Sequence, residues 1–297
     1  MRNFIIFFQE KTGTSALVRQ LDKFESISVV HQERNTGFEP FDTHNCGRMS
    51  LIDLEKCLDI IFNPGKKNIE YLNRIYGKTA KRPLDVINDN EAIGFKMRFS
   101  PPRRYPLHID GLSIWNKIAS KLFRNYYFRP FKRMMFRTLK KHDVVVLMAV
   151  RQDLLKLGLS KYHGDGTGKP GHLQFKLARG VITRDETEKI QVDCARLERI
   201  ISKCETLDEN NRHFMEELKN SGVEAHPILY EEFVADRRSY LERLFRTLKL
   251  NITKDELSKV LDQEEFLKKV HSDDISEFVE NHKEVTDRFA NRFVSWS

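Results

Sequence analysis

The residues best suited to chemistry follow the first apolar segment of the chain: Lys11, Thr12, Gly13, Thr14 and Ser15. Gly13 permits a tight backbone turn, and a helical pattern begins among the small hydroxyl residues. Successive N–H groups at a helix N-terminus, together with the helix dipole, attract anions. Lys11 adds positive charge, and the hydroxyls can donate hydrogen bonds. The segment predicts a phosphate- or sulfate-binding loop; the alternative is an ordinary Thr/Ser helix cap.

This loop differs from a Walker A loop, whose pattern is G-x-x-x-x-G-K-[ST]. Lys11 precedes Gly13 instead of following a second glycine. No metal-supporting carboxylate strand is evident at the fourth apolar segment either. The pattern therefore disfavours a metal-dependent nucleotide hydrolase.

A second candidate anion site follows apolar residues 144–150. Arg151 comes directly after them, and Ser160 lies nine residues further on, two to three turns into a helical pattern. An arginine and a hydroxyl so placed can hold one phosphate from two directions. The plain alternatives are a surface ion pair for Arg151 and a helix-surface hydroxyl for Ser160.

Both motifs resemble those of sulfotransferases that use 3′-phosphoadenylyl sulfate (PAPS). Residues 11–15 resemble the family's loop for the 5′-phosphate and sulfate, and Arg151 with Ser160 resembles its 3′-phosphate motif. The nine-residue interval is similar to that of the bacterial trehalose sulfotransferase-like (Stf) branch. Weaker likenesses to bacterial members cover residues 94–98, 229–236, 241–250 and 278–285. The resemblance implies sulfuryl transfer from PAPS to an acceptor hydroxyl, with adenosine 3′,5′-bisphosphate (PAP) as product and no metal.

The resemblance also implies residue roles. Lys11 is expected to offset negative charge in the transition state. A base for the acceptor hydroxyl belongs at the end of the second strand. Glu33 is the first choice, because the Stf branch carries a glutamate about there. His31 is the second, because cytosolic members use a histidine; neither residue need be the base. Two further hypotheses stay open, a small-molecule kinase and a non-catalytic PAP-binding protein.

These residues require a scaffold, and five apolar segments provide one: residues 4–8, 27–31, 92–99, 144–150 and 223–230. Continuous apolarity is typical of strands covered on both faces, as in a parallel sheet. A helical pattern at residues 15–24 joins the first two as a βαβ unit. We therefore expect an α/β fold with a central parallel sheet of about five strands, as a single P-loop-like domain over residues 1–297.

Helical regions complete the expected domain. Insertions fall at about residues 34–90 and 101–141, and further helices at about 185–218, 239–250 and 254–270, the last two within a C-terminal helical region, 239–297. Residues 34–90 and 100–141 match nothing in the family, so the acceptor stays open among carbohydrates, glycolipids and small molecules. The glycine-rich residues 163–172 predict a mobile loop or lid.

The basic, aromatic stretch at residues 117–141 allows two interpretations. Its aromatic residues can pack inward with cations facing water, which is the interpretation we favour. It can also meet an anionic glycan or a membrane surface. No nucleic-acid-binding motif accompanies it, so nucleic acid is not expected as a partner.

The composition fits a globular protein. The 297 residues are 32% charged and 40% hydrophobic, with a net charge of +8 that fits anionic ligands. No apolar run reaches the roughly 20 residues of a membrane-spanning helix, and residues 4–8 do not resemble a signal peptide. The four cysteines are sparse and lack C-x-x-C spacing, which predicts reduced thiols and a cytoplasmic location.

Overall fold

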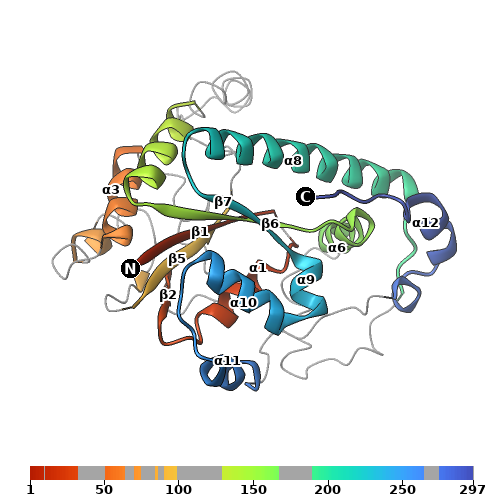
Figure 1. Cartoon of the computed structure of the whole chain (residues 1–297). Coiled ribbons are helices and arrows are strands. Elements are labelled where there is room, and N and C mark those ends of the chain that lie inside the picture. Colours follow the sequence, from red (N-terminus) through yellow and green to blue (C-terminus); the bar gives the residue numbers. More distant parts are fainter. Residues whose placement is uncertain are drawn as a thin grey trace.

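The computed structural model describes residues 1–9, 11–32, 51–63, 70–74, 84–85, 90–98, 129–166, 189–263 and 274–296. At its centre lies a five-stranded sheet in the order β2-β5-β1-β6-β7, and all neighbouring strands in it are parallel (Figure 1). Its strands are β1 (Arg2–Phe8), β2 (Ile27–Val29), β5 (Ala92–Met97), β6 (Val144–Val150) and β7 (Ala225–Leu229). The α/β class and all five expected strands are confirmed.

Both faces of the sheet are covered, which explains why its strands are mostly apolar. On β1, Ile5 and Phe7 face one hydrophobic cluster, while Phe4, Ile6 and Phe8 face another. The first cluster includes α3 (Leu51–Phe62), the helical residues 129–141 and the second half of α8 (Cys194–Asn220). The second includes α1 (Thr14–Leu21), α10 (Arg237–Thr247) and α11 (Lys254–Leu261). In Figure 1, α8 accordingly runs above the sheet, with α10 and α11 below it.

A third hydrophobic cluster lies beside the sheet. It joins α6 (Leu154–Gly166) and α12 (His282–Phe289) to the first half of α8. The remaining elements are short: α9 (Tyr230–Ala235), the 3₁₀ helix η1 (Ile275–Glu277), and a separate antiparallel pair of β3 (His31–Gln32) and β4 (Leu84–Asp85).

Several predicted boundaries were wrong. The second strand ends at Val29, and His31 belongs to β3 of the separate pair. The long helix expected from residue 185 begins at Cys194, because the Asp193 side chain accepts hydrogen bonds from the N–H groups of Ala195 and Arg196 and so caps it. The helix expected over 254–270 ends at Leu261, and the strand expected over 223–230 stops before Tyr230, which starts α9.

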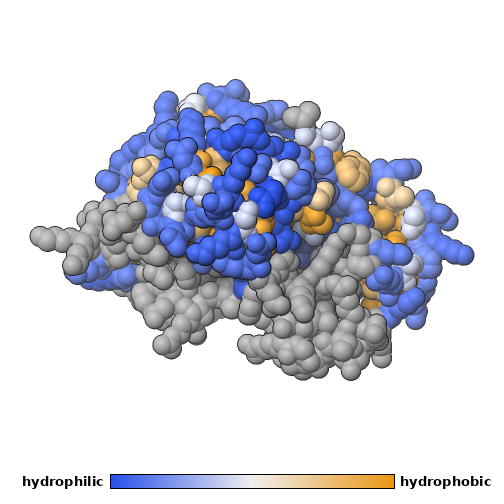
Figure 2. Space-filling view, turned by 60° about the horizontal axis from the view of Figure 1, so that its bottom comes forward, coloured by the Kyte–Doolittle hydropathy of each residue, from blue (hydrophilic) through white to orange (hydrophobic). Residues whose placement is uncertain are grey.

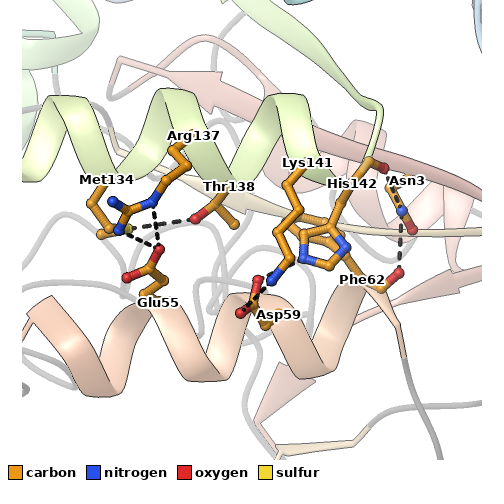
Figure 3. A network of polar contacts seen from close by, with 9 residues as sticks. All are labelled: Asn3, Glu55, Asp59, Phe62, Met134, Arg137, Thr138, Lys141 and His142. Atoms are coloured by element: carbon orange, nitrogen blue, oxygen red, sulfur yellow. Dashed lines mark hydrogen bonds and ion pairs between the residues drawn. The ribbon is translucent and has the colours of Figure 1, made fainter.

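For residues 129–141, the inward-packing interpretation of the basic stretch is confirmed. Phe131, Met134, Met135 and Leu139 are buried. Cations on the outer side pair with acids on α3: Arg137 Nη2 lies 2.6 Å from Glu55 Oε1, and Lys141 Nζ lies 2.9 Å from Asp59 Oδ2 (Figure 3). Residues 117–128 lie outside the described part of the chain.

Among the described residues, no helix combines the length and apolarity needed to cross a membrane. Figure 2 shows one face of the molecule, on which hydrophilic residues predominate and hydrophobic ones are scattered among them.

Candidate functional site

The site residues gather at the carboxyl edge of the sheet because all five strands run in the same direction. From β1 the chain crosses toward β5 and β2, whereas from β6 it crosses to β7 on the other side. The reversal of direction between β1 and β6 opens a crevice where α/β proteins commonly bind ligands. Lys11–Ser15 leaves the sheet at β1, and Arg151 leaves it at β6.

The loop after β1 has an unusual backbone. Lys11 and Gly13 both have positive φ, at 69° and 72°, and this conformation is uncommon for a lysine. Thr12 is buried and donates its hydroxyl hydrogen to the Gln9 carbonyl, at 2.7 Å. Gly13 occupies the N-cap of α1, and no side chain caps this helix. The Thr/Ser-cap alternative is therefore wrong, and the first N–H groups of α1 keep their capacity to bind an anion.

A buried lysine from β5 supports this loop. Lys96 is 1% exposed, its Nζ donates to Ser15 Oγ at 2.8 Å, and the same atom lies 4.9 Å from the centre of the Phe8 ring. Arg98, the residue directly after β5, has its guanidinium 5.7 Å from the centre of the same ring. Sequence reasoning assigned neither residue to the site. The available signal was a lysine inside an otherwise apolar strand. Burying a lysine is costly unless its charge is paired or hydrogen-bonded, so such a lysine points to a nearby partner.

Arg151 brings the second predicted motif against the first. Its Nη1 donates to the Lys11 carbonyl at 3.3 Å, and its guanidinium lies 4.6 Å from the centre of the Tyr230 ring. Arg151 Nε is buried and has no hydrogen-bond partner within the described residues. Ser160 lies in the second turn of α6, and within the described chain no hydrogen bond joins it to Arg151.

Tyr230 closes the turn at Gly13. A Cβ atom added to Gly13 would lie 2.4 Å from Tyr230 Cδ2, a distance at which atoms overlap. The ring therefore contacts Gly13 and the Arg151 guanidinium, one residue from each motif. Sequence reasoning used Tyr230 only as a family likeness; its position directly after the fifth apolar segment was the signal for a role at this edge.

The expected bases and several other residues are placed less fully. Glu33 lies outside the described residues, and for His31 the structure gives only the backbone, paired with Asp85 in the β3–β4 ladder. Of the glycine-rich residues 163–172, the first four are helical, in α6, instead of looped, and the rest lie outside the described part.

The described residues offer no group of three or more His, Cys, Asp or Glu side chains that could hold a metal. The three cysteines within that part, Cys57, Cys194 and Cys204, are free and buried. Burial, with the charge of Asp53 as a smaller cause, raises the pKa of the Cys57 thiol to about 12. Such a thiol is a poor nucleophile.

Comparison with known proteins finds no matching family model and no matching curated protein. Three solved structures that match are sulfotransferases. They are a sulfotransferase from Alicyclobacillus acidocaldarius (14% identity, TM-score 0.38, 98% of this chain and 92% of that one), sulfotransferase STF9 from Mycobacterium avium (11%, 0.39, 97% and 75%) and the sulfotransferase domain from the curacin biosynthetic pathway (11%, 0.39, 100% and 93%).

Proposed function

We propose that this protein is a PAPS-dependent sulfotransferase, acting as a single domain on a hydroxylated carbohydrate, glycolipid or small molecule. The observation that carries the proposal is the contact of Arg151 with the Lys11 carbonyl. The cation of Arg151, which follows β6, thus lies beside the loop after β1, and this contact supports two adjoining anion sites. PAPS and PAP carry phosphate at both the 5′ and the 3′ position of one ribose, which two adjoining sites suit.

The binding roles follow from the donors present. The N-terminal N–H groups of α1, Thr12, Gly13, Thr14 and Ser15 would hold the 5′-phosphosulfate. Lys96 donates to one lone pair of Ser15 Oγ, which leaves the Ser15 hydroxyl hydrogen to donate to the ligand. Arg151, with Ser160 from α6, would hold the 3′-phosphate.

In the reaction, the acceptor oxygen attacks sulfur in line with the departing 5′-phosphate oxygen. One S–O bond forms as the other breaks, and the acceptor proton passes to a base, for which Glu33 is our first choice and His31 the second. Lys11 would offset the charge that develops on the departing oxygen. The scheme requires no metal.

Equilibrium binding of three nucleotides tests the cofactor assignment. We expect PAP to bind more tightly than adenosine 5′-monophosphate (AMP) by roughly 2–3 kcal/mol, the scale of charge-assisted contacts to one phosphate. Magnesium ATP should bind more weakly than PAP. Tighter binding of magnesium ATP, with no preference for PAP over AMP, would instead establish the kinase alternative.

Transfer of label from ³⁵S-PAPS to a panel of glycans, glycolipids and phenols tests the chemistry. Glu33→Gln should lower turnover at least 100-fold while leaving PAP affinity unchanged, and normal turnover in this variant would move the base to His31. PAP binding without transfer to any acceptor would favour a non-catalytic binding protein.

A further inference from the structure

The backbone that follows Arg151 is paired with a segment far away in the sequence. Residues 292–296, here called the strap, run antiparallel to it through a bridge between Asp153 and Phe293. The Leu154 N–H donates to the Arg292 carbonyl, and the Val294 N–H donates to the Gln152 carbonyl, both at 3.1 Å. The strap therefore contacts the peptide groups immediately after Arg151, the residue proposed to bind the 3′-phosphate.

Side chains fix the strap to α8 at both of its ends. Residues 292, 294 and 296 are partly buried while 293 and 295 are exposed, the alternation of an extended segment. At one end, Arg292 donates to Glu198 at 2.7 Å and to Glu205 at 3.0 Å. Figure 1 shows the chain running from α12 back alongside α8 toward the sheet.

At the other end of the strap, Trp296 is anchored to Asp208, which is more buried than the partners of Arg292. Trp296 Nε1 donates to Asp208 Oδ1 at 2.7 Å, and Arg212 donates to the other carboxylate oxygen at 2.9 Å. The Arg212 guanidinium also lies 4.8 Å from the centre of the Trp296 ring. Asp208 is 5% exposed and, together with Gln9 and Arg151, lines a small cavity at the sheet edge.

Glu231, which lies outside the strap, also holds this backbone. Glu231 Oε1 accepts hydrogen bonds from the N–H groups of Gln152 and Asp153, at 3.0 and 3.1 Å. The peptide groups of residues 152–154 are thus fixed by Glu231 and by the strap. The Arg151 side chain, by contrast, makes one long hydrogen bond and one ring contact within the described residues. Its direction therefore depends on the backbone that carries it.

We propose that Trp296 is a positioning residue for Arg151: by holding the strap on Asp208, it sets the backbone that aims this arginine at the 3′-phosphate. The inference rests on the proposed function and extends it to residues that touch no ligand. It predicts that a change at Trp296 alters recognition of the 3′-phosphate specifically, and leaves recognition of the rest of the nucleotide intact.

The ratio of PAP to AMP affinity measures this effect, because a change in the folded fraction alters both affinities equally. Trp296→Phe keeps an aromatic ring but removes the N–H donor, together with part of the ring system. We expect it to lower the ratio about fivefold, in the range of mutations that act through a chain of contacts, and Trp296→Ala to lower it further. Phe293→Ala is the matched control: its side chain is 59% exposed on the same strap, and the ratio should stay at the wild-type value.

The double variant Arg151→Ala/Trp296→Phe tests whether the effect of Trp296 on the ratio is exerted through Arg151. If Trp296 acts through Arg151, the second change should not lower the ratio any further. A wild-type ratio retained in both Trp296 variants overturns the positioning role and leaves the proposed function standing. A wild-type protein that binds AMP as tightly as PAP overturns the proposed function, and the positioning role with it.

Discussion

The ammonium of Lys96 donates a hydrogen bond of 2.8 Å to the hydroxyl of Ser15, joining β5 to the first turn of α1. Lys96 is 1% exposed, so its burial is costly unless nearby groups stabilise the charge. The Phe8 ring supplies part of that stabilisation through a cation–π contact. A bound anion beside Ser15 would stabilise the ammonium further, so we expect Lys96 to contribute to binding of an anionic ligand.

Lys96→Met should therefore separate stability from ligand binding. Methionine has nearly the same length and no charge, so we expect the free energy of unfolding without ligand to stay the same or to rise. PAP affinity and turnover should both fall, each by about tenfold or more, because a cation near the phosphates is lost. Urea unfolding and PAP titration measure the two effects. Lys96→Arg is the charge-preserving control, and unchanged PAP affinity in Lys96→Met would contradict a role in binding.

Arg151→Ala should weaken PAP binding by roughly 2–3 kcal/mol, because a charge-assisted contact to the 3′-phosphate is lost. AMP has no 3′-phosphate, so its affinity should change little. Arg151→Lys keeps the charge but lacks the planar guanidinium that lies over Tyr230, and it should recover only part of the affinity. Calorimetric titration with both nucleotides measures the difference. Equal PAP affinity in the wild type and Arg151→Ala would remove Arg151 from the site.

Gly13→Ala should destabilise the loop for two independent reasons. The backbone at Gly13 has φ 72°, a left-handed conformation that costs an L-residue about 1 kcal/mol. The new methyl group would also overlap the Tyr230 ring. We expect a total loss of about 2–3 kcal/mol in the free energy of unfolding, with weaker PAP binding as well.

A double-mutant cycle separates the two causes. In a Tyr230→Ala background the overlap is gone, so Gly13→Ala should cost only the backbone component, about 1 kcal/mol. Urea unfolding of the four proteins gives the coupling energy. Additive effects of the two substitutions would show that the contact between Gly13 and Tyr230 is not the source of the strain.

The sequence was sufficient for the strands because β1, β2, β5 and β6 are buried almost along their whole length and are therefore mostly apolar. The sequence did not predict which strands pair with each other. His31 continues the apolar run 27–31, yet it pairs with Asp85 and not within the main sheet. A one-residue break after Val29 decides this, and apolarity alone does not encode it.

Within the site, short-range motifs were easier to predict than long-range contacts. Residues 11–13 form the turn, and Thr14 and Ser15 begin helix α1, as their types indicated. The approach of Arg151 to Lys11 and of Tyr230 to Gly13 spans 140 and 217 positions (230 minus 13) and depends on strand order. The anchoring of Trp296 on Asp208 could not be predicted at all, because it joins an extended segment to the middle of a long helix.

Acid should weaken the contact between α3 and residues 129–142 shown in Figure 3. Burial alone would raise the pKa of the Asp59 carboxyl, but hydrogen bonds from Lys141 and His142, with their charges, hold its pKa below the usual value. A pKa lowered by folding means that the carboxylate stabilises the folded state above the unfolded pKa of about 3.9. This stabilisation is lost as the pH falls below that value and through the folded pKa.

Asp59→Asn should consequently be less stable than the wild type at pH 7, and the gap should narrow as the pH drops from about 4 to 3. Urea midpoints across this range measure the gap. Glu55→Gln is the matched control on the same helix: its partner Arg137 is 67% exposed, so its loss should cost at most about 0.5 kcal/mol. A gap for Asp59→Asn that stays constant down to pH 3 would mean that steric packing, and not the charge of Asp59, holds the two helices together.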